Sequence, residues 1–403
     1  MIKHSRKIKL ESLFLLGIAV SCFPWISFGL NNMGMQPYFI LILLSSMMIY
    51  YHKYKVARFH HSIIFLPFVF ILFQSLNGVP IDFLLIRDFL SYLAFSVSFI
   101  FFYEYLLIYG FPKKFFYYIL IIWLLACVPQ YLFGEHVYSS LLFAKSSASR
   151  GFSSLASEPS FFGLHTAIIC SMILLFCKKE ETSKFLLLAI LSLGLSGSLT
   201  AFVYYSLLIS ISLILTRRLN VKFFILIVIS FLIAYFAILK NQRFGELINI
   251  IFDSGLIQLL VMDESSGSRI ADILTPYLLS FYNYFLPLGR VSNELDSLNF
   301  LCLSSNIFES LRSCGWLAND DKIGSYLGSM IFHFGFTVFP LICYFFFLIV
   351  RDLRTVIASI IFLILIVTTI PPGYPMMAFY LAAYLFYVQK KYTIKKPIHN
   401  AKL

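Results

Sequence analysis

A polar stretch at residues 149–163 stands where a loop leads into a strongly apolar segment. It contains one cation, Arg150, and one anion, Glu158. An arginine can donate two hydrogen bonds to phosphate oxygens and stays charged at any relevant pH. A carboxylate can accept a proton from an attacking hydroxyl. In a chain with 60% hydrophobic and 12% charged residues, fixed charges at a membrane mouth are the first candidates for a functional site.

Each of these two charges also has a simple structural explanation. An interfacial arginine such as Arg150 commonly extends toward lipid headgroups. Pro159 suits the first position of a helix, and an acid directly before it, Glu158, complements the positive helix end. The residue types alone leave both interpretations open.

Two further arginines bracket a predicted amphipathic helix. The Ser268 hydroxyl can cap a helix that begins at Arg269, and Arg290 stands in a turn after that helix. We expect the helix to lie on the bilayer surface or to pack over the membrane helices. Arg269 and Arg290 are suited to an anionic ligand, although both could equally be solvated. The apolar residues at helical spacing are Ile270, Ile273, Leu274, Tyr277, Leu278 and Phe281.

Other polar residues and cysteines carry weaker signals. Arg87 is a candidate substrate contact, although it can simply pair with its neighbour Asp88. Glu104 is expected at the membrane interface. Cys302 and Cys314 fall in one polar segment, and whether they form a disulfide in an oxidising compartment stays open. No Cys/His spacing resembles a metal site, so the sequence predicts neither a metal nor a cofactor.

Long apolar segments must position these residues. The chain has 403 residues, among them 46 Phe and 25 Tyr, and a mean hydropathy of +0.86. Because a span needs roughly 20 apolar residues, the sequence predicts an all-α polytopic membrane protein with about twelve transmembrane helices. The predicted spans are about 10–30, 36–51, 62–76, 86–109, 115–133, 160–177, 185–198, 200–215, 223–239, 326–350, 356–370 and 376–388.

The net charge of +12 is distributed as a topology signal. With the N-terminus inside, most of the 31 basic residues fall in short inside loops, and most of the 19 acidic residues fall outside. This bias follows the positive-inside rule and predicts that both termini are cytoplasmic. The basic residues are thereby explained without a nucleic-acid partner. Pro24 and Trp25 interrupt the first apolar run, which predicts an uncleaved first helix.

Two loops exceed the length needed to reverse the chain, and both are predicted to lie outside. Residues 134–159 carry the opening motif, and residues 240–325, between the ninth and tenth spans, contain the amphipathic helix. A loop as long as the second is typical of a functional segment. No repeat or linker divides the chain, so residues 1–403 are predicted to form one integral membrane domain.

These motifs and the predicted topology resemble the bacterial O-antigen polymerase family, within a broader group that includes the O-antigen ligases. The resemblance covers the whole chain in topology, and its most specific element is the first of the motifs that carry it. They are Arg150-Gly151 leading to Glu158-Pro159-Ser160-Phe161-Phe162-Gly163, then Ser196-Gly197-Ser198, then Ser268-Arg269 heading a helix, and Pro287-Leu288-Gly289 after that helix.

The resemblance implies a metal-independent, inverting glycosyl transfer at the periplasmic face of the bacterial inner membrane. The growing glycan on undecaprenyl diphosphate would be the donor, and one lipid-linked repeat unit the acceptor. By position, Arg150 and Arg269, with Arg290 as a third, would hold a diphosphate and neutralise the leaving group. Glu158 would orient the motif or help to activate the acceptor hydroxyl. The other candidate substrate contacts are Gly151, Ser268 and Arg87.

Two other functions remain as alternatives. An O-antigen ligase would transfer the glycan to the lipid A core; ligases often carry a histidine shortly before the tenth span, where Asp320 and Asp321 stand here. A flippase for lipid-linked oligosaccharide fits twelve spans, but transporters more often show two similar halves with polar residues at mid-membrane. The partners implied are lipid-linked glycans, membrane lipids and a separate chain-length regulator.

Overall fold

The structure is a computed structural model in which the described residues are mostly helical, without a β-strand among them. This confirms the all-α class for that part of the chain. Ile26 and Leu142 form an isolated antiparallel bridge between two connecting segments. The described residues are 2–27, 38–54, 59–142, 152–177, 181, 188–189, 191–192, 194–196, 264–291, 323–340, 342–343, 364, 366–367 and 373–393.

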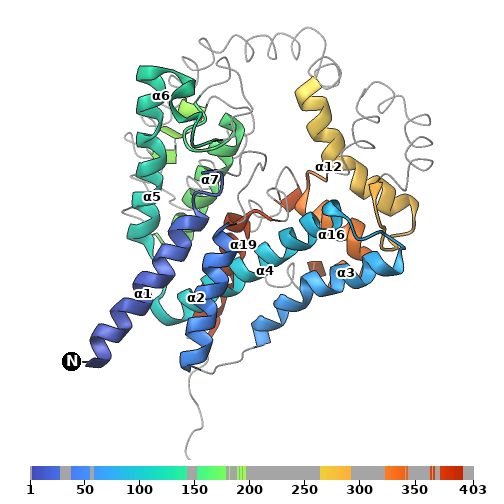
Figure 1. Cartoon of the computed structure of the whole chain (residues 1–403), viewed down its shortest axis with the longest axis horizontal. Helices are drawn as coiled ribbons and strands as arrows, with labels where there is room; N and C mark the ends of the chain where they lie inside the picture. The colour runs from blue at the N-terminus through green and yellow to red at the C-terminus, as the bar shows by residue number, and fades with distance from the viewer. Residues whose placement is uncertain are drawn as a thin grey trace, which may run out of the picture.

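Three helical segments in this part of the chain are long and apolar enough to cross a membrane (Figure 1). They are α4 (Phe83–Tyr109), the pair α5 and α6 (together Lys113–Phe133), and α7 (Pro159–Phe176). Each coincides with a predicted span to within a few residues. The helices α2 (Tyr38–Tyr54) and α19 (Pro375–Thr393) also fall on predicted spans.

The first helix is shorter at its C-terminal end than the predicted span 10–30. Helix α1 (Ile2–Ser21) ends before Pro24, because proline lacks an N–H and disfavours helical geometry in the residue before it. The chain then continues to Ser27, whose N–H donates to the Leu141 carbonyl over 2.7 Å. Trp25 in this segment is only 3% exposed, so the segment packs inward rather than completing the helix.

Two other predicted spans are also interrupted. Helix α5 (Lys113–Leu125) is separated from α6 (Cys127–Phe133) at Ala126, since Pro129 cannot donate a hydrogen bond to the carbonyl four residues before it. The predicted span 326–350 begins as α16 (Tyr326–Phe334), which ends at Gly335 and is followed by the 3₁₀ turn η5 (Gly335–Val338).

The predicted amphipathic helix exists, with different bounds. Helix α12 (Glu264–Tyr282) begins before Arg269, so Ser268 lies inside it and is not its cap. An acid at its first position complements the positive helix end, which favours the earlier start. The side chains that it buries against α16 are Thr275, Pro276, Leu279 and Ser280, whereas Leu274 and Phe281 are exposed.

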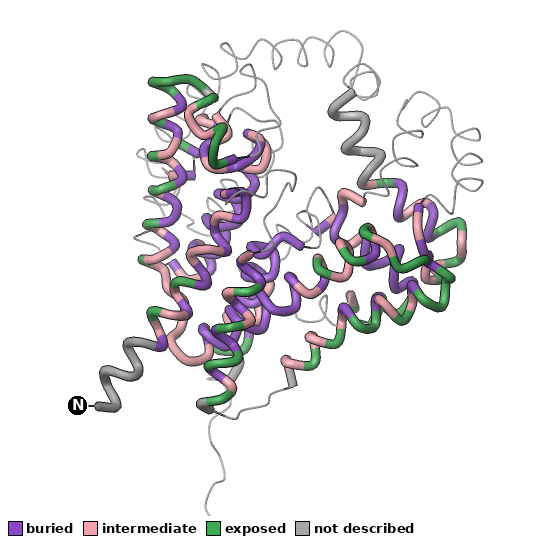
Figure 2. The backbone as a smooth tube through the Cα atoms, in the orientation of Figure 1, coloured by how far each residue is buried: buried purple, intermediate pink, exposed green. Residues whose placement is uncertain are grey.

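Helices α4, α19 and α7 form the centre of the described bundle. Helix α19 packs against both α4 and α7, and its residues 375–384 are buried except for the partly buried Leu381 (Figure 2). Around this centre, α1, α2 and α3 (Leu66–Leu76) pack on α4, and α5 packs on α7. Helix α12 lies on α16. At that contact, an added Cβ on Gly328 would lie 2.7 Å from Pro276 Cγ, so the glycine permits close packing.

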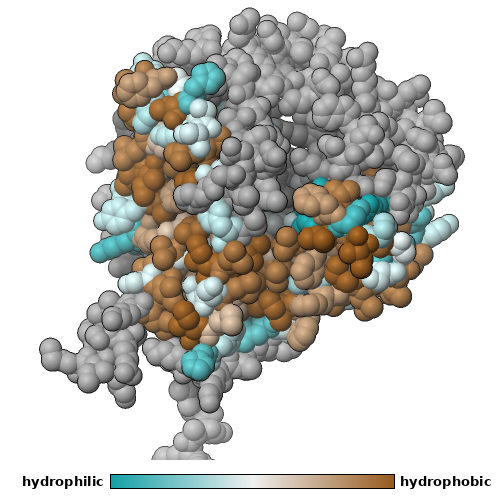
Figure 3. All heavy atoms as spheres, in the orientation of Figure 1, coloured by the Kyte–Doolittle hydropathy of each residue, from teal (hydrophilic) through white to brown (hydrophobic). Residues whose placement is uncertain are grey.

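Large apolar side chains cover the outer surface of the bundle, and the described surface in Figure 3 is predominantly apolar. On α3 and α5, Phe68, Leu76, Tyr118 and Leu125 are each more than half exposed. A soluble protein rarely exposes so much contiguous apolar surface. Lipid is the solvent that such a surface fits.

Candidate functional site

Glu158 stands at the junction between a loop and α7, as its place before Pro159 predicts. Its backbone is extended, and Pro159 occupies the first helical turn. The Glu158 carbonyl accepts hydrogen bonds from the N–H groups of Phe161 and Phe162, each over 3.1 Å. Its carboxylate makes no capping bond to the helix, and its Oε2 accepts a hydrogen bond from the Ser160 hydroxyl over 3.3 Å. The half-buried carboxylate is thus held at the positive end of a helix.

The loop before Glu158 is fixed by α5 and α6. Gln130 on α6 accepts a hydrogen bond from the Ser154 N–H over 2.8 Å and donates to the Ser153 hydroxyl over 2.8 Å. The Ser154 hydroxyl donates to the Trp123 carbonyl over 2.5 Å. Ser154 is fully buried with a left-handed backbone, φ +53°. Two of these contacts hold a strained residue four positions before Glu158, and the third holds its neighbour Ser153.

An aromatic layer lies beneath this loop. Trp25, Trp123 and Tyr374 surround His165 of α7, with ring centroids 4.5–6.0 Å from it. His165 Nδ1 and the Tyr374 hydroxyl are hydrogen-bonded at 2.5 Å. Within the described part of the chain, Trp123 Nε1 and His165 Nε2 are buried without a hydrogen-bond partner. These rings pack closely around the N-terminal part of α7, next to the loop that precedes Glu158.

A second charged group lies at the start of α4. The Asp82 carboxylate caps this helix by accepting from the Leu85 N–H over 3.0 Å, and it forms an ion pair with Arg290. The Arg290 guanidinium and the Leu85 N–H together hold the pKa of the Asp82 carboxyl below its usual range. Arg290 is 16% exposed, so it is a partly buried, paired cation and not a freely solvated one.

The segment at residues 286–290, which carries Arg290, is hydrogen-bonded to the C-terminal end of α3 and to the end of α16. Gln74 Nε2 donates to the Leu288 carbonyl over 3.1 Å, and Asn77 Nδ2 donates to the Pro287 carbonyl over 3.2 Å. The Leu288 N–H in turn donates to the Phe332 carbonyl over 2.7 Å. The predicted turn at residues 287–290 is displaced: the chain turns at residues 283–285, directly after α12, and residues 286–290 follow as an irregular segment that packs against two helices.

The other predicted site residues are distributed as follows. Arg87 Nε donates to Asp88 Oδ1 over 2.9 Å, which is the local pairing that the sequence suggests. Arg150 and Gly151 lie outside the described residues, as do Cys302 and Cys314. Ser268 and Arg269 are described only as backbone within α12, where Arg269 lies in the second turn instead of at the N-terminus. Of the residues that the structure describes, Glu158 and Arg290 share no described contact.

Comparison with known proteins adds nothing to this geometry. No protein-family model, no curated protein and no solved structure matches the chain. The interpretation of the site therefore rests on the residues themselves.

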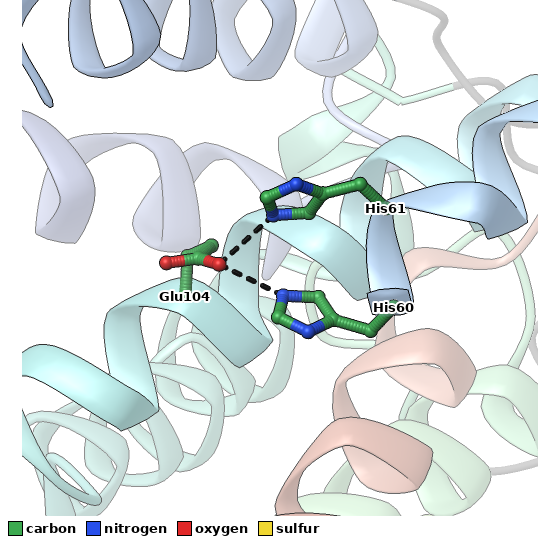
Figure 4. Close-up of side chains that lie close together, drawn as sticks. All are labelled: His60, His61 and Glu104. Carbon is green, nitrogen blue, oxygen red and sulfur yellow. Dashed lines mark hydrogen bonds and ion pairs between the residues drawn. The ribbon is translucent and has the colours of Figure 1, made fainter. Parts of the chain in front are cut away.

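A third group of polar side chains lies near the other end of α4 (Figure 4). Glu104 is 2% exposed and is thus buried among protein side chains, while its position at the membrane interface stays a prediction. Its Oε1 lies 2.8 Å from His60 Nε2 and 2.9 Å from His61 Nε2, and its Oε2 accepts from the Tyr50 hydroxyl over 2.9 Å. The two imidazoles and the carboxylate can together hold a metal ion.

Several of these residues carry no signal in the sequence that points to a site. Gln130 is a single polar residue within the apolar helix α6, Asp82 directly precedes α4, and only the fold shows what they contact. His60 and His61 precede Glu104 by more than 40 residues, a separation far outside the short spacings that identify metal motifs. The only local feature that could have drawn attention to this cluster is that His60 and His61 are adjacent in sequence.

Proposed function

We propose that this chain is a polytopic inner-membrane glycosyltransferase of the O-antigen polymerase class. It would have about twelve spans and would join undecaprenyl-diphosphate-linked repeat units at the periplasmic face. The observation that carries the proposal is the motif at 150–163. Its described part is a buried, multiply anchored loop that delivers Glu158 to the start of α7. A catalytic carboxylate has to be held in a defined position relative to its substrate, and this hydrogen-bonded loop can hold Glu158 in that way.

The contacts between loops support the proposed topology. Segments that the alternating topology places outside contact one another, as Asn77 does Pro287. Ser27, near the outer end of the first predicted span, likewise contacts Leu141 of an outside loop. Segments placed inside do the same, since Lys113 Nζ pairs with Glu181 at 2.5 Å. Three helical segments that are long and apolar enough to span a membrane agree with this arrangement.

In the proposed reaction, an acceptor hydroxyl attacks the anomeric carbon of the donor glycan. The bond from that carbon to the diphosphate oxygen breaks, and the diphosphate departs with the electron pair. Arg150 and Arg269 would neutralise the departing diphosphate, while Glu158 would take the hydroxyl proton. Arg290 would join them only by exchanging the Asp82 carboxylate for a phosphate, because the two residues are paired in the structure.

The test is the lipopolysaccharide ladder of a deletion strain that is complemented with wild type, Arg150→Ala, Glu158→Gln or the control His136→Gln. His136 is exposed and lies in the loop segment after α6, so its replacement should leave the ladder intact. The deletion should leave lipid A core that bears a single repeat unit. Both Arg150→Ala and Glu158→Gln should stay at that band while their protein level in the membrane equals that of wild type.

Other band patterns contradict the proposal and identify the alternatives. Core without any repeat, together with polymer on undecaprenyl diphosphate, would identify a ligase. Core without any repeat and without periplasmic polymer would identify a flippase. A full ladder from Glu158→Gln would remove Glu158 from the mechanism.

A further inference from the structure

The cluster formed by His60, His61 and Glu104 joins two elements that are distant in sequence. Both histidines lie in the 3₁₀ segment η1 (Phe59–Phe65), which leads into α3, and Glu104 lies near the end of α4. The two imidazole Nε2 atoms converge on a single carboxylate oxygen. Two adjacent imidazoles and one buried carboxylate thus form a single compact cluster.

We propose that His60, His61 and Glu104 bind a divalent transition-metal ion of the Zn²⁺ type. Imidazole nitrogen and carboxylate oxygen are ligands that such ions prefer, whereas Mg²⁺ and Ca²⁺ prefer oxygen alone. The three ligand atoms lie within 4.8 Å of one another. Tetrahedral bonds of about 2.0–2.1 Å would place ligand atoms roughly 3.3 Å apart, so each present contact of 2.8–2.9 Å opens by about half an ångström.

The surroundings of the three ligands fit a metal centre. Tyr50 donates to the second oxygen of Glu104 and thereby orients the first oxygen toward the histidines. The Tyr103 ring packs edge-on against His60 with centroids 4.7 Å apart, and Tyr51 packs in the same way against His61 at 5.0 Å. These rings restrict the imidazoles to the converging arrangement. Three protein ligands leave a fourth position for water.

The metal ion would stabilise the fold and would take no part in glycosyl transfer. Glu104 lies roughly 33 Å along α4 from Asp82, at about 1.5 Å per residue, and therefore at the opposite end of that helix from Arg87 and Arg290. A bound ion would tie the connection before α3 to α4. The site is thus independent of the proposed transferase site, and the reaction there stays metal-independent.

The deciding experiment measures metal binding by the full chain, purified in detergent with an affinity tag that contains no histidine. After treatment with a chelator and dialysis, the protein is titrated with Zn²⁺ by calorimetry, and the retained zinc is counted by mass spectrometry. Wild type should bind one equivalent and melt at a higher temperature with zinc than without it. His60→Asn, His61→Asn and Glu104→Gln should each weaken binding by more than about 100-fold, since each removes a ligand.

Two further variants separate a metal centre from a simple hydrogen-bonded cluster. Tyr50→Phe removes only the group that orients Glu104 and should weaken zinc binding by about 10–100-fold. His52→Asn removes an exposed histidine from α2 and should leave both affinity and stoichiometry unchanged. If Glu104→Gln does not fold, the two histidine variants decide. Wild-type affinity in folded His60→Asn and His61→Asn protein, or no zinc-dependent rise in wild-type melting temperature, would overturn the proposal.

Discussion

Glu158 owes its position to residues that carry no charge. Gln130 uses both ends of its amide to hold Ser153 and Ser154, and the Trp123 carbonyl accepts from the Ser154 hydroxyl. A neutral amide suits this task, because it can donate and accept at once without bringing a charge into an apolar environment. The geometry of the carboxylate therefore depends on a glutamine in a different helix.

Replacing Gln130 tests this dependence. Gln130→Ala leaves the buried Ser154 N–H without its acceptor, which should cost about 1–3 kcal/mol of unfolding free energy. It should also shorten the polymer ladder if the loop positions Glu158. Thermal unfolding in detergent and the ladder are the two measurements. Val128→Ala, an exposed change on the same helix, is the control and should alter neither.

The Asp82–Arg290 ion pair makes stability dependent on pH. The folded-state pKa of Asp82 lies below its ordinary value of 3.8, so the pair stabilises the fold above that value. This contribution is lost as pH falls through the lower, folded-state pKa. Asp82→Asn keeps a residue that can cap α4 but removes the charge. Wild type should therefore melt at a higher temperature than Asp82→Asn at pH 5–7, and the difference should shrink below about pH 4. A constant difference down to pH 3 contradicts this assignment.

At the scale of single residues, the sequence predicts contacts between residues that are close together in the chain. The extended Glu158 before a helix-initiating Pro159 follows from helix-end chemistry, and so does the pairing of Arg87 with Asp88. Contacts between distant residues do not follow, because nothing in the local pattern states which helices meet. Asp82 with Arg290, which are 208 residues apart, is an example of a pair that only packing reveals.

At the scale of elements, the junction between α12 and α16 depends on one glycine. Gly335 has φ +59°, and an added Cβ would lie 2.4 Å from the Phe285 carbonyl oxygen and 2.7 Å from the Pro287 nitrogen. The Phe336 N–H donates to that same carbonyl over 2.8 Å. Backbone from the turn after α12 thus lies directly on the backbone at the end of α16.

Gly335→Ala and Gly78→Ala compare a crowded glycine with an open one, both at positive φ. Gly78 has a similar φ of +66°, but an added Cβ there meets nothing within 4 Å. Gly78→Ala should cost about 1–2 kcal/mol, the ordinary penalty of a left-handed residue. Gly335→Ala should cost more than about 3 kcal/mol, because the Phe285 carbonyl must also move. Comparable losses of melting temperature in the two variants would contradict the close approach at Gly335.

Helix boundaries were predicted well where the chain is straight and poorly where it breaks. The bounds of α4 and α7 follow from unbroken apolar runs with clear ends. The interruptions at Ala126 and Gly335 were missed, although Pro129 and Gly335 themselves were visible signals. For α12, apolar spacing alone does not say which side meets protein and which side meets lipid, so the sequence leaves both placements open.

At the scale of the whole molecule, the proposed topology predicts which residues are reached from each side of the membrane. In a background with Cys302, Cys314 and Cys343 replaced by serine, Ile81→Cys and His136→Cys should react with a membrane-impermeant maleimide in intact spheroplasts. His52→Cys and Lys114→Cys should react only after permeabilisation, since the positive-inside rule places both in the cytoplasm. Labelling of Lys114→Cys in intact spheroplasts would reverse the orientation and exclude a periplasmic site at Glu158.

Composition and charge distribution predict the class of molecule but not its internal arrangement. The apolar content and the basic bias of the short loops are enough to expect an all-α membrane protein. They do not reveal that α19 lies between α4 and α7, because association inside a membrane depends on detailed packing and not on hydrophobicity. The convergence of His60 and His61 on Glu104 does not follow from composition for the same reason.

The central position of α19 has a consequence for biosynthesis. Its residues from Met376 to Phe379 are fully buried, and Phe379 lies against Phe102 of α4 with centroids 4.6 Å apart. The ribosome completes α4 and α7 long before α19 emerges. Lipid or an insertion chaperone must therefore occupy the surfaces that α19 later covers, and displacing that occupant becomes the closing step of assembly. Ribosome stalling before α19 should thus yield an inserted but protease-sensitive intermediate.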